Sequence, residues 1–350
     1  LRRRLIMIEP IRRFQHRAGS LAILALLFIA AASLSAQVKI AQGNAPALAK
    51  GLALAGPDRP ANVPANFVIT PFGYFHPSCV FRIEEGETLL GDGRVEHVNG
   101  AVDAQVPVCA YPHYTHSGSP IAADAGEASV ASDSHASTER TPTIDGWLEY
   151  INTTTTSWYD EITATWTVPP QPEVTKYPTI FFFPGFEDYN NVLSIVQPVL
   201  QWYSPGPWMV ASWNCCMQGT VYESRPQKAS PGDTIVGTIM QMCKKGSGFC
   251  QEWKVVTENQ TTGHTTALRK TPLAGQVWNW AFGAVLEVYG VTQCGNFPAD
   301  SSLTMTVELY DQNRNLIADP GWTGVPAPSG TDPSCPYGLG ITPNEETLEY

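Results

Sequence analysis

Two stretches in the second half of this chain alternate strictly between apolar and polar side chains. In EITATWTVP, Ile162, Ala164 and Trp166 share one side of an extended backbone, and the intervening threonines share the other. LTMTVELYD repeats the pattern from Leu303 to Leu309. A period of two is typical of half-buried strands, and no helical period extends over ten or more residues after the first 36. The sequence therefore predicts an all-β fold, an antiparallel double-sheet β-sandwich.

The composition agrees with short strands joined by turns. The 350 residues include 29 Gly and 29 Pro, 43% are hydrophobic, and only 15% are charged. All ten tryptophans lie at or after Trp147. Little charge combined with many Thr, Val, Trp and Tyr residues is typical of a secreted all-β protein.

Residues 1–36 have the pattern of a signal peptide. Six arginines precede the apolar run LAILALLFIAAASL, residues 21–34, and small residues follow near Ala36. An apolar run of this length is too short for a membrane span and fits the apolar region of an export signal. We therefore expect secretion to an extracellular or periplasmic compartment, with a retained N-terminal anchor as the alternative.

The formal net charge argues against nucleic acid as a partner. It is −11 for the whole chain, and cleavage after Ala36 removes six Arg and one Glu, which leaves about −16. Such acidity also opposes binding to an anionic membrane once the signal peptide is cleaved.

The eight cysteines all follow the predicted signal peptide, and an even number in an exported chain predicts up to four disulfides. Cys243 and Cys250 flank KKGSGF and fit a stapled loop, while Cys79 and Cys109 lie in a separate segment and are candidates for a second pair. The sequence leaves the remaining partners open. No CxxC pair is present, so we expect no metal site.

Changes in composition divide the rest of the chain into three regions. Residues 37–115 carry short strand signals and turn residues and fit a propeptide-like segment. Residues 116–143 are small and polar and fit a flexible linker or processing region. Residues 144–350 carry the tryptophans and the alternating strands, and fit the β-sandwich domain.

One strand-like stretch, NWAFGAVLEVYGVTQC, is apolar on both faces. Alternation puts Ala281, Val285, Glu287 and Tyr289 on the same face, and Glu287 is the only carboxyl side chain in the stretch. Burying an unpaired carboxylate is costly enough that the group raises its pKa instead. Glu287 is therefore either paired with a structural partner or held for proton transfer.

A second apolar stretch, VLSIVQPVLQW, carries two amides, Gln197 and Gln201, with Pro198 beside the first. A buried amide without hydrogen-bond partners costs about 1–3 kcal/mol. Either these amides are satisfied within the core, or one of them is directed at a bound molecule.

Six motifs follow one another in the order GWLEYI, ITATWTVPP, IFFFPGFED, LSIVQPVLQW, SPGDTIVGTI and AVLEVYGV. Their order, over about residues 146–300, resembles the glutamic peptidases of the eqolisin family, which are secreted endopeptidases that act in acid. The resemblance implies a sandwich of the concanavalin-like or jelly-roll type, protein or peptide substrates, and no cofactor. We expect a monomer.

By this resemblance, Gln197 falls on the catalytic glutamine of the family and Glu287 on its catalytic glutamate. The chemistry of the pair is reasonable without the family. A carboxylate can activate water and then, as the acid, protonate the departing amine. An amide NH₂ can stabilise the oxyanion, which is worth about 2.7–4 kcal/mol in other enzymes. Trp166, Phe183 and Trp202 are further candidates for lining the substrate cleft.

The sequence departs from the family at two acidic positions. Gln201 stands where the family has an acidic residue, and Ser212 stands opposite a later glutamate of the family. A third position is conservatively replaced, because Glu187 or Asp188 takes the place of a family aspartate. With Gln197 assigned to the oxyanion, we expect Gln201 to be a supporting or surface amide.

The resemblance also gives the segment before the sandwich a role as an inhibitory propeptide. Five of the seven histidines lie in or just after this segment: His76, His97, His113, His116 and His135. Their protonation in acid could loosen a propeptide held against an acidic domain. The alternative is a solvated set of histidines with no such role.

Two other functions fit the same sequence. Six tryptophans on a β-sandwich could form a surface that binds carbohydrate: Trp158, Trp166, Trp202, Trp208, Trp213 and Trp253. A secreted structural or adhesive domain is a third hypothesis. The peptidase interpretation requires Gln197 and Glu287 in one cleft, and a closed ion pair between Glu287 and Arg225 or Arg269 would weaken it.

Overall fold

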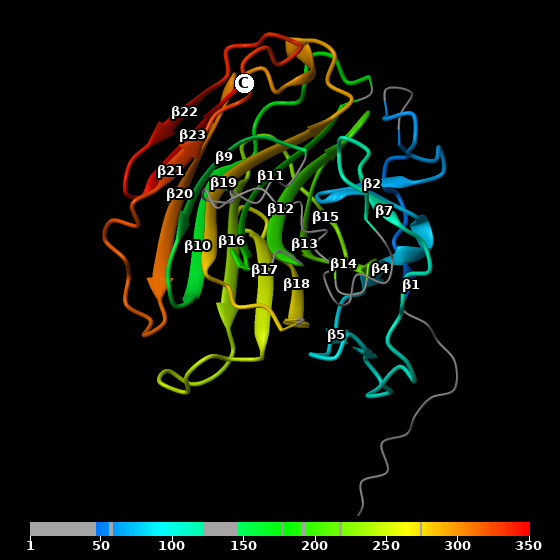
Figure 1. Cartoon of the computed structure of the whole chain (residues 1–350), viewed down its shortest axis with the longest axis vertical. Coiled ribbons are helices and arrows are strands. Elements are labelled where there is room, and N and C mark those ends of the chain that lie inside the picture. The colour runs from blue at the N-terminus through cyan, green and yellow to red at the C-terminus, as the bar shows by residue number, and fades with distance from the viewer. Residues whose placement is uncertain are drawn as a thin grey trace, which may run out of the picture. The chain divides into compact units, whose positions relative to one another are not determined.

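The computed structural model describes residues 47–55, 59–121, 146–176, 178–190, 194–216, 219–273 and 275–350, which all belong to one compact unit. The predicted signal peptide and residues 122–143 of the predicted linker lie outside the described residues. The described chain is built from strands in two large sheets and two small ones (Figure 1). The predicted antiparallel double-sheet β-sandwich is confirmed.

The larger sheet has ten strands, and its first two come from residues 47–121, which we call the leader. The strand order is β1 (Ala47–Leu48), β4 (Val80–Ile83), β14 (Val221–Ser224), β13 (Trp208–Cys215), β12 (Ile195–Tyr203), β11 (Thr179–Glu187), β19 (Trp280–Tyr289), β9 (Trp147–Thr154) and β21 (Thr323–Val325), with β15 (Gln227–Lys228) paired to β13. All neighbours pair antiparallel except β4 and β14, which are parallel.

The second large sheet has seven antiparallel strands from the sandwich domain. Its order is β18 (His264–Thr271), β17 (Trp253–Asn259), β16 (Thr234–Gln241), β10 (Tyr159–Thr167), β20 (Ser302–Asp311), β23 (Glu345–Glu349) and β22 (Gly338–Ile341). A short 3₁₀ helix, η3 (Cys294–Asn296), precedes β20.

The rest of the leader forms two small sheets. One has four strands, β2 (Val68–Thr70), β3 (Gly73–Phe75), β7 (His113–Tyr114) and β8 (Pro120–Ile121), and the other has two, β5 (Thr88–Leu89) and β6 (Val95–Glu96). A 3₁₀ helix, η1 (Pro77–Cys79), leads from the first of these sheets into β4. No helix among the described residues is long and apolar enough to cross a bilayer.

The strands that alternate in sequence alternate in burial. In β10, Ile162, Ala164 and Trp166 are buried, while the threonines between them are partly or fully exposed. In β20, the apolar residues from Leu303 to Leu309 are buried and the polar residues between them are exposed. Because one face of each strand meets a core and the other meets water, the period of two is visible in the sequence.

Two hydrophobic cores lie on opposite faces of the ten-stranded sheet. The inter-sheet core joins side chains such as Phe182 and Leu286 to Ile235 and Met305 of the seven-stranded sheet. The leader-side core, on the other face, joins Phe183, Trp213 and Val285 of the sandwich to leader side chains that include Phe67 and Phe75. Strands β11, β12 and β19 are apolar on both faces because each face is covered.

A one-residue slip in β19 changes part of the predicted pattern. The pairing register with β9 shifts between Phe282 and Ala284, around Gly283. As a result Ala281 belongs to the inter-sheet core, whereas Val285 belongs to the leader-side core. The prediction that Ala281 shares a face with Glu287 is therefore wrong, since simple alternation takes no account of a bulge.

The eight cysteines form four pairs. Cys243–Cys250 and Cys79–Cys109 are paired as predicted, and the sequence left the other two pairs, Cys215–Cys216 and Cys294–Cys335, open. One predicted pair closes a loop of the sandwich, and the other lies within the leader. Each predicted pair thus stabilises its own region of the chain.

Candidate active site

Glu287 lies near the end of β19 in the row of side chains that faces the leader. Its neighbours in this row, Val285 and Tyr289, belong to the leader-side core. The Glu287 carboxyl is completely buried, and this burial raises its pKa to about 8. The Tyr289 hydroxyl donates a hydrogen bond to Oε1 and opposes the shift. Trp147 opposes it too, although its indole nitrogen does not meet the carboxyl in hydrogen-bond geometry.

No ion pair neutralises Glu287 among the residues that the structure describes. Arg225, one of the two candidate partners in the sequence, lies 3.8 Å from Glu84 of the leader instead. The carboxyl therefore remains dry without a compensating cation, and the neutral acid is its stable form at neutral pH. Such a group can exchange a proton when water reaches it.

Gln197 lies on the central strand β12 and faces the same way. Ile195 and Val199, which flank it at intervals of two, belong to the leader-side core. The Gln197 amide is completely buried, and its Nε2 donates to the carbonyl oxygen of Pro71 at 3.2 Å. The amide NH₂ is thus satisfied by the backbone of the leader, and no hydrogen-bond partner for its Oε1 occurs in the described part of the chain.

The pairing registers relate the two side chains to each other. Glu287 is level with Gln201 across β11, so Gln197 lies two strands and four residues away from Glu287. Gln201 and Glu223, on β14, are likewise two strands and four residues apart, along the same diagonal of the sheet. In that second pair, Nε2 of Gln201 lies 3.2 Å from Oε1 of Glu223. A glutamine and a glutamate therefore span this diagonal on the same face of the same sheet.

A hairpin of the leader covers both side chains. Strands β2 and β3 are joined by the turn Thr70–Gly73, whose Pro71 carbonyl accepts from Gln197. The neighbouring carbonyl oxygen, of Thr70, lies 3.3 Å from the Tyr289 hydroxyl, which shares its one proton between this carbonyl and Glu287. The turn requires glycine at its end, because Gly73 has φ +117° and a Cβ there would lie 2.2 Å from the carbonyl oxygen of Tyr114.

Aromatic and imidazole rings complete the cover over Glu287. The Tyr74 ring of the leader meets the Tyr289 ring edge to face at 5.3 Å, and burial, together with the charge of Glu287, raises the pKa of Tyr74 to about 12. His116 packs against Tyr289 at 4.9 Å. A Cβ added at Gly146 would meet both His116 and the Glu287 carboxyl. Water therefore has no open path to this carboxyl while the leader is in place.

The three candidate cleft residues do not lie together. Phe183 faces the leader, in the row of β11 that lies between Gln197 and Glu287. Trp166 and Trp202 belong to the inter-sheet core, where each is almost fully buried. These two side chains thus point away from the face that carries Glu287, whereas Phe183 is completely buried on that face.

The acidic replacements take different places. Asp188 accepts from the backbone N–H groups of Asn190 and Val277, both at 2.9 Å, so it is a structural carboxylate. Glu187 is completely buried, and burial raises its pKa well above the ordinary value. Ser212 points away from the leader, because its hydroxyl lies 3.0 Å from that of Thr257 in the seven-stranded sheet.

Sequence reasoning missed the acidic centre next to the candidate pair. Glu223, in VYES, is completely buried on β14, next to β4 of the leader, and binds both Gln201 and Arg82 of the leader. The short strand that carries Glu223 has no sequence period long enough to reveal its face. Tyr289 could have been found, since it follows Glu287 by two residues in the same strand.

The histidines of the leader occupy three kinds of environment. His97 lies between Glu87 (2.7 Å) and Asp103 (2.8 Å), and these partners raise its pKa. His113 is buried beside Phe75, and burial lowers its pKa to about 4. His76 caps η1 by accepting from the N–H of Ser78, and His135 lies outside the described residues.

No model of a known protein family and no curated protein matches the sequence. Among solved structures, the chain is similar to scytalido-glutamic peptidase bound to a peptide-based transition-state analogue, with 13% identity over 58% of this chain and 98% of the other, at a TM-score of 0.43. It is also similar to SCP-B, an eqolisin bound to the tripeptide Ala-Ile-His, with 14% identity over 59% and 98% of the two chains and a TM-score of 0.43. A tailspike protein of bacteriophage CBA120 gives 14% identity over 44% and 23%, with a TM-score of 0.23. These values do not assign the chain to a family.

Proposed function

We propose that this chain is the precursor of a secreted glutamic-type endopeptidase that hydrolyses peptide bonds at acidic pH. The observation that carries the proposal is the single turn Thr70–Gly73, which covers a dry acid and a buried amide on the same sheet face. An acid and an amide donor could together hydrolyse a peptide bond, and burying both under one turn is costly in an ordinary core. Their burial is therefore more typical of a blocked active site. Four cysteine pairs are in keeping with an exported protein.

Glu287 would act first as a base and then as an acid. Its raised pKa arises from burial, so the admission of water lowers the pKa and yields the carboxylate. The carboxylate then takes a proton from a water molecule that attacks the peptide carbonyl. The same group, now protonated, delivers that proton to the leaving amine, which completes the hydrolysis.

Gln197 would stabilise the tetrahedral intermediate. Its Nε2 already donates to one peptide carbonyl, that of Pro71, in the covered state. After the leader withdraws, the same donor is available for the carbonyl oxygen of a substrate, whose charge grows in the transition state. In the covered state the leader backbone thus occupies the position that we assign to the substrate backbone.

The leader, which comprises most of the predicted propeptide 37–115 and the first residues of the predicted linker, would be the inhibitor of its own sandwich domain. It fills the leader-side core, adds β1 and β4 to the large sheet and excludes water from Glu287. Activation would require its displacement or cleavage within residues 116–143. The product would be a monomer that acts on protein or peptide substrates.

The proposal is tested by hydrolysis of a denatured protein by the acidified full chain over pH 2–7. The wild type should be active, whereas Glu287→Gln and Gln197→Ala should be almost inactive. Glu149→Gln is a matched control, because burial also raises the pKa of Glu149 to about 8 but this residue lies on the inter-sheet side of β9. Equal activity in the wild type and Glu287→Gln, or none in the wild type, would end the proposal.

The structure weakens the alternative hypothesis that tryptophans on the sandwich surface bind carbohydrate. Of the six tryptophans proposed for such a surface, five are buried, and Trp158 alone is partly exposed. Stacking against a sugar needs an accessible ring face, so one side chain provides little surface for it. We therefore propose no second function.

A further inference from the structure

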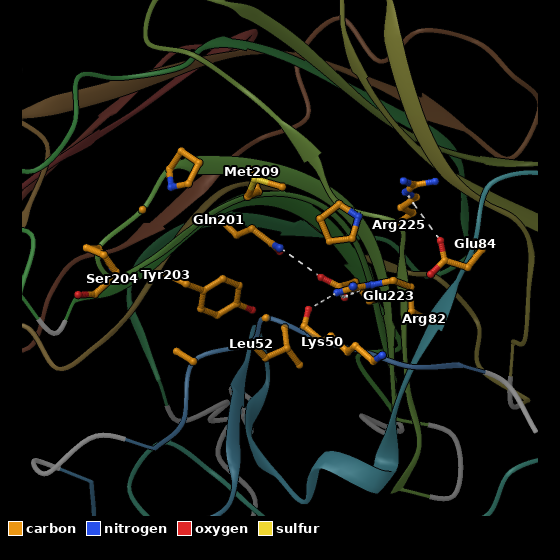
Figure 2. Close-up of a pocket in the computed structure, with 16 residues that line it drawn as sticks. Lys50, Leu52, Arg82, Glu84, Gln201, Tyr203, Ser204, Met209, Glu223 and Arg225 are labelled. Atoms are coloured by element: carbon orange, nitrogen blue, oxygen red, sulfur yellow. Dashed lines mark hydrogen bonds and ion pairs between the residues drawn. The ribbon is translucent and has the colours of Figure 1, made fainter.

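A buried ion pair joins the leader to the sandwich domain beside the candidate active site. Nη2 and Nε of Arg82, on β4, lie 2.6 Å and 3.2 Å from Oε2 of Glu223. Glu223 is completely buried, and only 15% of the Arg82 side chain is exposed. The Arg82 guanidinium also donates to the carbonyl of Lys50 at 2.7 Å, so the leader holds its own cation in position (Figure 2).

Glu223, which receives this guanidinium, belongs to the sandwich domain, as do the side chains that orient it. Oε1 of Glu223 accepts from Nε2 of Gln201 at 3.2 Å, and Oε1 of Gln201 accepts from the indole of Trp213 at 2.9 Å. This chain of hydrogen bonds fixes the carboxylate and leaves Oε2 for a cation. Burial raises the pKa of Glu223, and Arg82 opposes this shift, so a bound cation favours the charged form of this carboxyl.

The backbone around Arg82 is extended and pairs with the sandwich in the way that a bound peptide pairs with a protein strand. β4 adds to the edge of β14, with Arg82 directly paired with Glu223. Peptides are commonly bound by such strand addition, in which backbone hydrogen bonds provide affinity and side-chain pockets provide specificity. Arg82 therefore enters a pocket of the sandwich from a strand that the sandwich itself aligns.

The pocket has room for more than one side chain. A cavity of about 700 Å³ lies between the leader and the sandwich, and Figure 2 shows Lys50, Leu52, Tyr203 and Met209 around the pair. Gln201, which holds Glu223, lies in the same β12 row as Gln197, four residues further along. The guanidinium pocket thus lies on the same sheet face as the candidate catalytic pair.

We propose that Glu223, oriented by Gln201, is a subsite for an arginine side chain of the substrate, and that Arg82 of the leader fills this subsite before activation. This inference rests on the proposed function and adds a substrate class to it. It selects arginine because a guanidinium presents several donors in a plane, as Arg82 does toward Glu223 and Lys50. A merely structural ion pair would bind the leader but would not influence where substrates are cut.

The guanidinium site can be tested without catalysis by chemical rescue of the full chain. Arg82→Ala removes the side chain and leaves a gap beside Glu223, so millimolar ethylguanidinium should raise the melting temperature by about 2–5 °C and reach saturation. Ethylammonium should have a smaller effect, and sodium chloride at equal ionic strength should have none. Arg82→Ala with Glu223→Gln is the matched control and should not respond. Rescue that is absent, or equal in both backgrounds, would overturn the site.

The specificity is tested by sequencing the peptides that the acidified full chain releases from a denatured protein. In the wild type, arginine should be enriched at one fixed position relative to the cut. Glu223→Gln should lower the preference for arginine over glutamine at that position by about ten- to a hundredfold. Because this ratio is taken within each variant, differences in leader release cancel. An unchanged ratio would overturn the subsite.

The two proposals fail in different ways. Cleavage without a preference for arginine would overturn the subsite and leave the peptidase standing. No cleavage of any substrate by the wild type would overturn the peptidase, and with it the role of the pocket in substrate choice. The rescue experiment would then still decide whether Glu223 binds a guanidinium.

Discussion

The face of the sheet under the leader carries two acid–amide pairs along the same diagonal, and they differ in what neutralises the acid. Glu223 meets Gln201 and the guanidinium of Arg82. Glu287, set at the same displacement from Gln197, meets the phenol of Tyr289 and no cation among the described residues. Burial raises the pKa of both acids, but at Glu223 the guanidinium of Arg82 opposes the rise, whereas no cation among the described residues opposes it at Glu287. The backbone spacing is the same in the two pairs, but Gln201 and Glu223 are joined by a hydrogen bond, whereas Gln197 and Glu287 have separate partners and Phe183 lies on the strand between them.

The largest effect should come from removing the unpaired acid. Glu287→Gln keeps the size of the side chain but cannot exchange a proton, so we expect kcat for hydrolysis of a denatured protein to fall by about 10²–10⁴-fold. If kcat falls equally in Glu149→Gln, the loss reflects the removal of any buried carboxyl, and Glu287 has no special role in catalysis.

The amide of the same pair should have the next largest effect on hydrolysis. Gln197→Ala removes one oxyanion donor, and we expect kcat to fall by about 10²–10³-fold. Gln197→Glu is a useful companion, because it retains the length of the side chain but introduces an acceptor where a donor is needed. A wild-type kcat in either Gln197→Ala or Gln197→Glu would contradict the role of Gln197.

The paired acid should matter most for holding the leader. Arg82→Ala leaves Glu223 buried without its cation, which costs about 3–5 kcal/mol in comparable sites. Hydrogen exchange over β4 and the hairpin should become faster, and the leader should leave at a higher pH. Restoration of slow exchange by Arg82→Lys, but not by Arg82→Gln, would support charge as the cause. Unchanged exchange in Arg82→Ala would contradict it.

The histidines of the leader should respond to acid in opposite directions. Burial lowers the pKa of His113 from 6.5 to about 4, so the unfolded leader binds a proton that the folded leader refuses. The folded form of the leader should therefore lose up to about 3 kcal/mol of stability as the pH falls from 6.5 to 4. His97 has a raised pKa, because of Glu87 first and then Asp103, so its contribution is complete below pH 6.5 and is lost as the pH rises.

This difference can be measured by the pH at which the leader loses protection from hydrogen exchange. His113→Phe retains a flat ring beside Phe75 and cannot be protonated, so release should shift to lower pH. His97→Gln should not produce this shift. If both variants release the leader at the wild-type pH, the acid sensitivity comes from other groups.

The strands of the sandwich were easier to predict from the sequence than the strands of the leader. The periods of β10 and β20 are visible because water lies on one side of each strand, so burial and sequence alternate together. The short strands of the leader have two to four residues each, which is too few for a period. Their place at the edge of the large sheet depends on pairing with β14, about 140 positions away, and no local signal reveals such a contact.

Within the candidate site, the alternation of side chains along a strand explains which of the predicted residues share a face. Gln197 and Gln201 are four residues apart in β12 and share a face. Trp202 is next to Gln201 and must therefore point the other way, so alternation alone already argued against its place in the cleft. Trp166 lies in the other sheet, which the sequence could not show. Ala281 was misplaced because the slip at Gly283 interrupts the alternation.

The account depends on one claim, that Gln197 and Glu287 become a working pair when the turn Thr70–Gly73 leaves them. The most direct test follows two signals in the same samples of the full chain as the pH is lowered from 7 to 2. One signal is the hydrogen-exchange protection of residues 68–75, and the other is hydrolysis of a denatured protein. We predict that hydrolysis begins at the pH where protection is lost. Hydrolysis with the hairpin still protected, or loss of protection with no hydrolysis at any pH, would contradict the claim.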